Sequence, residues 1–358
     1  MYAGFCEPGK ASFLIGGQWG SEGKGAVAAS IAVELDKRGQ HFDIVTTNAA
    51  AQAGHTSTHD GVSRVCFHMP TIPLIARHPD KQTAIYLNAG AIIDIDILLK
   101  ELAVHWEPLI SSGQVSLVIH PRAAVITQEC KDEEGDRDSA ATAIASTRKG
   151  VGAALARKVM RKGKVVADCP ELSPFRGIVD LNYHMSRGRS VAVEVPQGQS
   201  LSLNGRFYPF TTSRVCSVQQ AMADADIHPV YYNKSVMVLR TYPIRVGNIM
   251  EGDKLLGTSG DFYHDQHEMS WKELGQTPEI TTVTKRVRRV FSPSRHQTLD
   301  SFAQTRPNIV FISFCDYNES KARQIVEWCK EAAELYCIDP PEFVFGYGPT
   351  TLDVRSKI

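Results

Sequence analysis

Short apolar runs recur along the chain and alternate with segments whose apolar residues have helical spacing. The helical segments include 26–38, a segment that begins at Asp94, and 321–336, whose apolar residues fall on one face. Continuous apolar strands that alternate with helices are typical of a mostly parallel central sheet with helices on both faces. We therefore predict a single α/β domain over residues 1–358, with insertions. The predicted buried strands are 11–15, 42–46, 84–87, 115–119, 191–195, 236–239 and 309–314.

Two segments interrupt this pattern. The run from Lys131 to Ser146 is rich in acidic residues, a composition typical of a solvated, mobile loop. The stretch from Gly247 to Pro278 shows no regular period, and loops of that length often cover a functional site.

Composition narrows the function classes. The 358 residues carry 39 Lys and Arg against 39 Asp and Glu, so no overall charge attracts nucleic acid or an anionic membrane. No apolar segment approaches the roughly 20 residues that a membrane helix needs, and the N-terminus lacks a signal pattern, so we expect a cytoplasmic protein. The eight cysteines form no C-x-x-C pair, and we expect reduced, structural thiols that act as small hydrophobic residues.

The glycine-rich stretch from Gly16 to Gly25 is the most informative segment, because it joins the first predicted strand to the first helix. Backbone N–H groups and the helix dipole favour anions at such a helix start, and Lys24 adds a positive charge for phosphate oxygens. The stretch is not a Walker A loop: five residues separate Gly17 from Gly23, and Gly25 follows the lysine in place of Ser or Thr. We predict a P-loop-like phosphate site here.

Within this stretch, Gln-Trp-Gly-x-Glu-Gly-Lys-Gly resembles the signature of adenylosuccinate synthetases. Further matches follow in the family's order and cover roughly residues 11 to 350. The resemblance implies the adenylosuccinate synthetase fold, C–N ligase activity, a Mg²⁺ cofactor and a homodimer. It makes Lys24 catalytic. It also assigns to the nucleoside triphosphate the loop residues Gly20, Glu22, Gly23, Lys24 and Gly25.

The segment from Gln52 to Thr56 is similar to the family's Asn-Ala-Gly-His-Thr, with Gln52 in place of Asn. In the family this histidine stabilises the phosphoryl group as it moves from the donor to a purine O6, a task that suits a cationic imidazole. Outside such a context a histidine is more often structural. The resemblance makes His55 catalytic, assigns Gln52 to the acceptor nucleotide, and assigns Gly54, His55 and Thr56 to the donor.

A third segment, from Ser146 to Arg161, is similar to the family's Thr-Thr-Gly-Arg-Gly-Ile-Gly-Pro-Ala-Tyr and the basic helix after it. Alone, it could be a glycine turn before a surface helix. The resemblance assigns Ser146 and Thr147 to the acceptor's 5′-phosphate, and Arg161 to the site of a neighbouring subunit. It also assigns Lys149 to the acceptor nucleotide, where the family has Arg, so a point charge replaces a bidentate fork.

Two shorter matches add contacts to the same nucleotide. Glu-Val-Pro-Gln-Gly at 194–198 resembles the family's Glu-Gly-Ala-Gln-Gly, and Tyr-Pro-Phe-Thr-Thr-Ser at 208–213 resembles Tyr-Pro-Tyr-Val-Thr-Ser. Each match is modest alone, because a strand-end Gln or Thr is usually a loop hydrogen-bonder. The resemblance implies a catalytic, base-contacting Gln197, with Thr212 and Val246 also at the acceptor nucleotide.

The densest basic run spans 281–290. A nucleic-acid patch is the alternative interpretation, but the neutral chain and the few interleaved aromatic residues argue against it. The run is similar to the family's Thr-Thr-Gly-Arg-x-Arg-Arg, and paired arginines suit a dicarboxylate such as L-aspartate. The implied aspartate-binding residues are Thr282, Val283, Thr284, Arg286 and Arg288. Arg288 is also assigned to the nucleoside triphosphate.

Near the C-terminus, 309–316 occupies the place of the family's Thr-Lys-Leu-Asp, which reads the guanine of GTP. Asp316 matches, but Phe314 stands at the lysine position. The turn at 346–349 is similar to the terminal Ser-Thr-Gly-Pro, which places Gly348 and Pro349 at the donor's base and ribose. Because the lysine is missing, ATP or dATP becomes a plausible donor, with GTP still open.

Ser21 is the decisive departure. The ordinary family member has an Asp here that takes the N1 proton of IMP and ligates Mg²⁺, whereas a serine hydroxyl neither carries charge nor titrates near neutrality. With Ser21 in place of this Asp, the chain resembles a phage branch of the family that uses dGMP. The resemblance implies that dGMP, L-aspartate and ATP or dATP give N6-succinyl-2-amino-2′-deoxyadenylate, ADP or dADP, and phosphate through a 6-phosphoryl intermediate. Ser21 would then be catalytic, bind dGMP and, with Gly54, contact the metal.

Two rival functions remain open. A conventional synthetase that uses IMP and GTP shares almost every motif. A non-catalytic nucleotide-binding protein is the other alternative, but it has no need of the Thr/Arg run.

Overall fold

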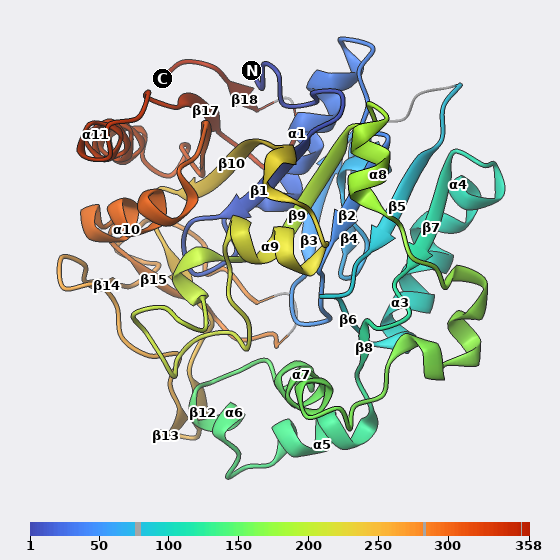
Figure 1. Ribbon diagram of the computed structural model, residues 1–358. Helices are drawn as coiled ribbons and strands as arrows, with labels where there is room; N and C mark the ends of the chain where they lie inside the picture. Colours follow the sequence, from blue (N-terminus) through green and yellow to red (C-terminus); the bar gives the residue numbers. More distant parts are fainter. Residues whose placement is uncertain (76–79, 282–283, 352) are drawn as a thin grey trace.

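The computed structural model describes residues 1–75, 80–281, 284–351 and 353–358. Its centre is a nine-stranded sheet with the order β18-β17-β16-β10-β1-β9-β2-β5-β7 (Figure 1). Every neighbouring pair in this sheet is parallel except β17 with β18. The predicted mostly parallel sheet is therefore confirmed. The strands are β1 (Ala11–Gly16), β2 (Ile44–Thr47), β5 (Thr83–Leu87), β7 (Val115–Ile119), β9 (Val191–Gly198), β10 (Tyr232–Arg240), β16 (Ile309–Ser313), β17 (Glu342–Gly346) and β18 (Val354–Arg355).

Helices cover both faces of the sheet because successive strand residues point to opposite sides. Leu14 of β1 packs with Val27 and Ile31 of α1, whereas Phe13 packs on the other side with the helices α8 and α9. The helices α10 and α11 continue this second layer over β10 and β16. The main helices are α1 (Lys24–Asp36), α2 (Ile72–Ile75), α3 (Ile95–Glu101), α4 (Glu107–Ser111), α5 (Gln128–Gly135), α6 (Ala140–Ala143), α7 (Val151–Val159), α8 (Leu181–Ser186), α9 (Val218–Asp224), α10 (Arg295–Thr305) and α11 (Glu319–Leu335).

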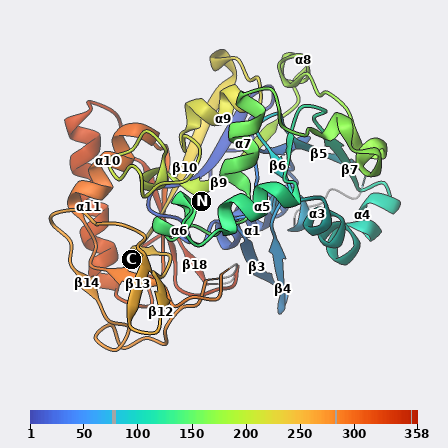
Figure 2. The ribbon, with the colours of Figure 1, turned by 90° about the horizontal axis from the view of Figure 1, so that it is seen from below.

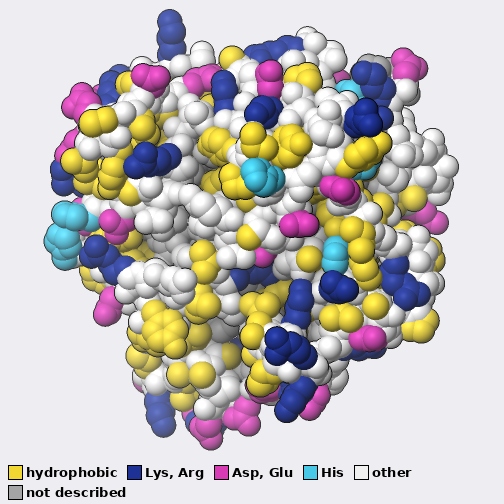
Figure 3. Space-filling view, viewed as in Figure 1, with side chains coloured by type: hydrophobic (Ala, Val, Ile, Leu, Met, Phe, Trp, Pro, Cys, Tyr) yellow, Lys and Arg dark blue, Asp and Glu magenta, His cyan; other side chains and the backbone are white. Residues whose placement is uncertain are grey.

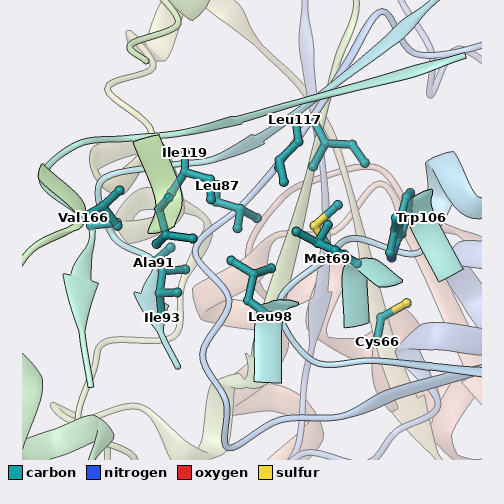
Figure 4. Close-up of a cluster of buried hydrophobic side chains, with 14 of the residues drawn as sticks. Cys66, Met69, Leu87, Ala91, Ile93, Leu98, Trp106, Leu117, Ile119 and Val166 are labelled. Carbon is teal, nitrogen blue, oxygen red and sulfur yellow. The ribbon is translucent and has the colours of Figure 1, made fainter. Parts of the chain in front are cut away.

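The two ends of the sheet carry separate hydrophobic clusters. Beside β5 and β7, buried side chains from the sheet meet α3 and α4, and Trp106 is fully buried there (Figure 4). At the opposite end, α10 and α11 pack together, as both views show (Figure 2). Phosphate-loop residues thus extend from the middle of a sheet that is well packed on both flanks.

Short strands and turns build the rim around the sheet. A hairpin, β3 (His55–His59) with β4 (Val62–Cys66), contacts α1. The stretch 247–278 is largely irregular, as predicted, with short strands inside it. The remaining strands are β6 (Ile92–Ile93), β8 (Ala124–Val125), β11 (Ile244–Arg245), β12 (Ile249–Glu251), β13 (Lys254–Gly257), β14 (Glu268–Met269) and β15 (Arg289–Phe291).

Residues 131–146 are not the solvated loop that their composition suggested. They form most of α5 and all of α6, and each helix is capped by a hydroxyl: Thr127 accepts from the N–H of Cys130, and Ser139 from the N–H of Thr142. Each cap satisfies a backbone N–H group at the start of its helix and so stabilises a helix that the acidic, polar composition did not predict.

All eight cysteines are free, and seven are buried as expected of small hydrophobic residues. Cys337 is exposed, so the burial prediction is wrong for this residue. Among the helices that the structure describes, none combines the length and apolar character needed to cross a membrane.

Candidate functional site

A cavity of about 530 Å³ opens beside the loop that follows β1. Residues from seven separate stretches of the chain, from Trp19 to Arg288, line it. It brings together most of the residues predicted for the acceptor, the donor phosphates and the chemical step. These are Gly20, Ser21, Gly23, Lys24, Gly25, Gln52, Gly54, His55, Thr56, Ser146, Thr147, Gln197, Thr212, Val246, Thr284 and Arg288.

The phosphate loop is held from beneath by the carboxylate of Glu22. This side chain is fully buried and accepts hydrogen bonds from the N–H groups of Gln18 (3.1 Å) and Gly20 (2.8 Å), while the Lys24 ammonium lies 2.8 Å away. Although burial acts to raise it, Lys24 and backbone N–H groups of the loop, Gly20 among them, hold the pKa of the Glu22 carboxyl below its usual range. Glu22 therefore shapes the loop from inside and does not line the cavity.

The loop backbone needs left-handed conformations. Gly20 and Gly23 have φ angles of 87° and 86°, and Ser21 has a φ of 57°. Gly25 is required for a different reason: a Cβ there would lie 2.3 Å from the carbonyl oxygen of Thr56. The β3–β4 hairpin thus packs directly on the start of α1, which explains why glycine follows Lys24 in place of Ser or Thr.

That hairpin carries His55. Its Nε2 lies 3.3 Å from the carbonyl oxygen of Pro196. Burial, reinforced by the Lys24 charge, lowers the pKa of His55 to about 4. The imidazole is therefore neutral near pH 7 in the ligand-free protein, whereas the sequence interpretation favoured a cation.

Ser21 is held by two arginines. The Arg288 guanidinium donates to Ser21 Oγ at 2.6 Å, and Arg240 donates to the Ser21 carbonyl oxygen at 3.2 Å. Arg240 is fully buried and pairs with Glu279, which also accepts from the hydroxyl of Tyr317 at 3.2 Å. Arg240 and Glu279 were missed by the sequence interpretation. The sequence signal that could have identified Arg240 is an arginine directly after the apolar run 236–239.

Polar residues on the other wall are also connected. Gln52 Nε2 donates to Thr212 Oγ1 at 2.9 Å, which links the second and fifth predicted motifs. Ser146 and Thr147 lie close to the N-terminus of α7, where Gly150 has a φ of 77°. Glu134, another residue that the interpretation missed, accepts from the N–H groups of Gly150, Gly152 and Ala153 at 2.7, 2.7 and 3.2 Å.

A second cavity, of about 980 Å³, adjoins the first and shares Thr147, Thr284 and Arg288 with it. It contains Lys149 and Arg286, which the smaller cavity does not. Arg286 donates from Nη2 to the carbonyl oxygens of Ala145 (2.9 Å) and Ser146 (3.0 Å), so the Thr/Arg run is tied to the 5′-phosphate segment. Thr282 and Val283, both predicted for aspartate, lie outside the described residues.

The predicted donor-base residues lie away from both cavities. One face of the Phe314 ring is covered by the Arg240 guanidinium, whose central carbon is 3.9 Å from the ring centroid. Asp316 is exposed. A Cβ on Gly348 would meet the Asp353 carboxylate at 2.6 Å, and Pro349 follows it. Of the four residues, Phe314 lies beside the phosphate loop, because a Cβ added to Gly23 would be 3.8 Å from its ring.

Arg161 is exposed and follows α7, where it lines neither cavity within this one chain. Its neighbours Val159 and Met160 are 70% and 57% exposed.

The sequence is similar to those of known proteins. The sequence profile described as adenylosuccinate synthetase matches residues 13–180 and 177–291. The N6-succino-2-amino-2′-deoxyadenylate synthase of Vibrio phage phiVC8 is 34% identical over 95% of this chain and 96% of its own length. The adenylosuccinate synthetase of Methanocaldococcus jannaschii is 30% identical over 78% of this chain and 74% of its own.

Two solved structures of the same family have a similar fold. The cyanophage S-2L succinoaminodeoxyadenylate synthetase (PurZ), bound to dGMP and to dATP as an energy donor, superposes with a TM-score of 0.81 at 31% identity and covers 97% of this chain and 95% of its own. Plasmodium falciparum adenylosuccinate synthetase shares the fold, with a TM-score of 0.70 at 15% identity over 96% of this chain and 98% of its own. The chain belongs to the adenylosuccinate synthetase family and is similar over nearly its whole length to the phage synthases within it.

Proposed function

We propose that this protein is a ligase that joins L-aspartate to C6 of dGMP with hydrolysis of ATP or dATP. The donor's terminal phosphoryl group passes to the guanine O6. The aspartate amine then attacks C6, the C6–O6 bond breaks, and phosphate leaves with that oxygen. The products are N6-succinyl-2-amino-2′-deoxyadenylate, ADP or dADP, and phosphate.

The observation that carries the choice of acceptor is Ser21. Its hydroxyl lies in an otherwise intact phosphate loop and is bonded to Arg288 at 2.6 Å, so a neutral donor/acceptor stands where IMP-using relatives place a carboxylate. A smaller, uncharged group leaves room near N1 and the 2-amino group of guanine. The similarity to phage synthases of this name supports the same acceptor.

The test is turnover of dGMP against IMP, each with aspartate and with ATP, dATP or GTP. We expect dGMP to be preferred by at least about tenfold, or about 1.4 kcal/mol of transition-state discrimination. Ser21→Asp should move the preference towards IMP, whereas Ser21→Ala, the matched control, should lower turnover without that change. Faster turnover of IMP by the unaltered protein would favour a conventional synthetase, and no turnover of either would favour a nucleotide-binding protein.

The proposed roles follow from position. Lys24 and the loop N–H groups hold the transferred phosphoryl group, and His55 faces the same cavity. A phosphate placed beside His55 supplies the negative charge that raises its pKa, so the neutral imidazole can gain a proton when nucleotides bind. Gln197, 8% exposed at the end of β9, contacts the purine.

For the acceptor phosphate we propose Ser146, Thr147, Gln52 and Thr212, which are joined in part by the Gln52–Thr212 bond. Lys149 lies in the larger cavity, next to Thr147, and is proposed for the same nucleotide. Arg286 in the larger cavity, with Thr284 and Arg288 at its boundary with the smaller one, suits the carboxylates of L-aspartate.

Mg²⁺ is proposed as the cofactor. Ser21 and Gly54 offer neutral, hard oxygen atoms on the same cavity, and Mg²⁺ commonly keeps several waters and binds chiefly through substrate phosphates. Two neutral protein oxygens therefore fit an ion that arrives with the nucleotide. When bound, the ion neutralises charge on the phosphate oxygens.

The donor is proposed to be ATP or dATP, because Phe314 offers apolar contact and no polar guanine readout. The ring lies beside Gly23 of the phosphate loop, within reach of a nucleotide held there. Product formed only with GTP would overturn this part of the proposal and leave Asp316 as the guanine reader.

We also propose a homodimer that acts in the cytoplasm of its host cell, where its nucleotide substrates are found. Exposed Val159 and Met160 beside Arg161 give α7 an apolar end that a second copy can cover. Mixing an Arg161→Ala variant with a His55→Asn variant should restore part of the turnover if Arg161 serves the neighbouring site.

A further inference from the structure

A second cluster of polar side chains lies at the first turn of α10, away from the nucleotide cavities. There, His264, Asp265 and His296 place potential ligand atoms that all lie within 4.8 Å of one another. Histidine side chains gather at the left edge of the space-filling view, over the region of α10 (Figure 3). None of the three residues lines either of the cavities described above.

The closest pair of atoms has the spacing of two ligands on one ion. His296 Nδ1 lies 3.2 Å from Asp265 Oδ2. Two ligands about 2.0–2.1 Å from a tetrahedral zinc ion are roughly 3.3–3.4 Å apart, so this pair is already at that distance. His264 completes the group: its ring centroid is 4.0 Å from that of His296, and its exposed side chain can rotate to close the remaining gap.

The second observation is an unsatisfied nitrogen. His296 Nδ1 is buried, and it has no hydrogen-bond partner with acceptable geometry among the residues that the structure describes. The nearby Asp265 is fixed by other donors, because its carboxylate accepts from Ser294 Oγ at 2.6 Å and from the His296 N–H at 3.2 Å.

We propose that His264, Asp265 and His296 bind one divalent transition-metal ion of the zinc class. Two imidazoles and one carboxylate are the ligand types that zinc accepts, and they select against Mg²⁺ and Ca²⁺, which prefer oxygen ligands. Such an ion ties the irregular segment before β14 to the first turn of α10.

The site has a direct structural neighbour in the phosphate loop. Tyr263 precedes the first ligand and packs with Phe207 and with Trp19 of the loop, at ring-centroid distances of 5.0 and 6.0 Å. An ion that orders residues 264 and 265 therefore stabilises the aromatic cluster that supports Trp19. This role is structural and does not depend on the proposed reaction.

The test is calorimetric titration of the full chain with Zn²⁺ in excess Mg²⁺, in a Cys337→Ser background that removes the exposed thiol. We expect one ion per chain, and His264→Ala or His296→Ala should weaken binding by about ten- to a hundredfold or more. The matched control is His267→Ala, which removes an exposed histidine of the same segment and should bind like the parent.

Spectroscopy and exchange give readouts independent of turnover. Co²⁺ in the parent should show the intense visible absorption of tetrahedral coordination, and Zn²⁺ should slow hydrogen exchange in residues 261–268. The proposal is overturned if the parent shows no saturable Zn²⁺ binding, or if His264→Ala and His296→Ala bind as tightly as His267→Ala.

Discussion

The two adjoining cavities differ in how they hold the lysines and arginines assigned to their ligands. In the smaller one, Lys24 is 5% exposed and paired with the fully buried Glu22. In the larger one, Arg289 is paired with Glu268, but no ion pair joins Arg148, Lys149 or Arg286 to a carboxylate in the described part of the chain. A paired lysine fixes a loop before its ligand arrives, whereas unpaired cations attract an anion and gain their partner from it. The difference indicates that the smaller cavity positions its ligand precisely, whereas the larger one attracts an anionic ligand.

The largest expected effect tests the buried lysine pair of the smaller cavity. Lys24→Met leaves the Glu22 carboxylate buried without its cation, which should lower the free energy of unfolding by about 3–5 kcal/mol. Urea denaturation measures it. The control is Lys37→Met, since Lys37 forms an equally short pair with Glu34 but is 65% exposed, and such a pair is worth about 0–1 kcal/mol. Equal losses in the two variants would contradict the assignment.

The next effect separates chemistry from binding within the smaller cavity. His55→Asn keeps a polar group of similar size but cannot become cationic, so the chemical step should slow by about a hundred- to a thousandfold while dGMP affinity is largely kept. Single-turnover phosphate release and dGMP binding are measured on the same sample. His59→Asn, on the same hairpin, is the control. Near-normal phosphate release would return His55 to a structural role, and lost dGMP binding would make it a positioning residue.

The larger cavity gives the third effect. Arg286→Leu should raise the KM for aspartate far more than that for dGMP, because loss of a carboxylate contact costs about 2–5 kcal/mol when desolvated, and an open cavity favours the lower part of that range. Steady-state kinetics with each substrate varied measure the two constants. Lys285→Leu removes the exposed neighbouring charge and should change neither. An unchanged aspartate KM in folded Arg286→Leu rules out the assignment.

The smallest effect concerns a buried carboxyl group in β9. Glu194 of β9 is buried and accepts from the N–H groups of Thr71 and Ile72, and burial raises its pKa from the usual 4.5 to about 7. The folded chain therefore binds this proton more tightly than the unfolded chain does. Its contribution to stability is complete below pH 4.5 and is lost as the pH rises through about 7, by at most about 1.4 kcal/mol per pH unit.

Unfolding free energies of the parent and of Glu194→Gln, measured from about pH 5 to about pH 8, check this slope. The variant should lose the part of the fall that belongs to Glu194. Parallel profiles for the two proteins would show that Glu194 is ionised throughout the range.

The sequence predicted the sheet and the phosphate loop well because both are local. Apolar runs identify buried strands whatever packs on them, and the glycines of the loop are close together in the chain. Arg240 and Glu279 were not predicted because their pairing joins positions far apart in sequence. The strand β17 was also missed. Helices α5 and α6 were missed since their caps, Thr127 and Ser139, were outweighed by an acidic composition. That residues 1–358 form one domain stays a prediction.

Gly25 has a consequence for how such proteins can change. A serine at this position would complete the Gly-Lys-Ser ending of a Walker A loop, yet its Cβ would fall 2.3 Å from the Thr56 carbonyl oxygen. The hydroxyl that ordinary P-loop enzymes use to hold their metal and the hairpin that carries His55 compete for one space. A single codon change therefore cannot lead from one nucleotide-binding solution to the other. A change from one to the other must displace the hairpin as well as shorten the loop, so packing and loop length both separate the two solutions.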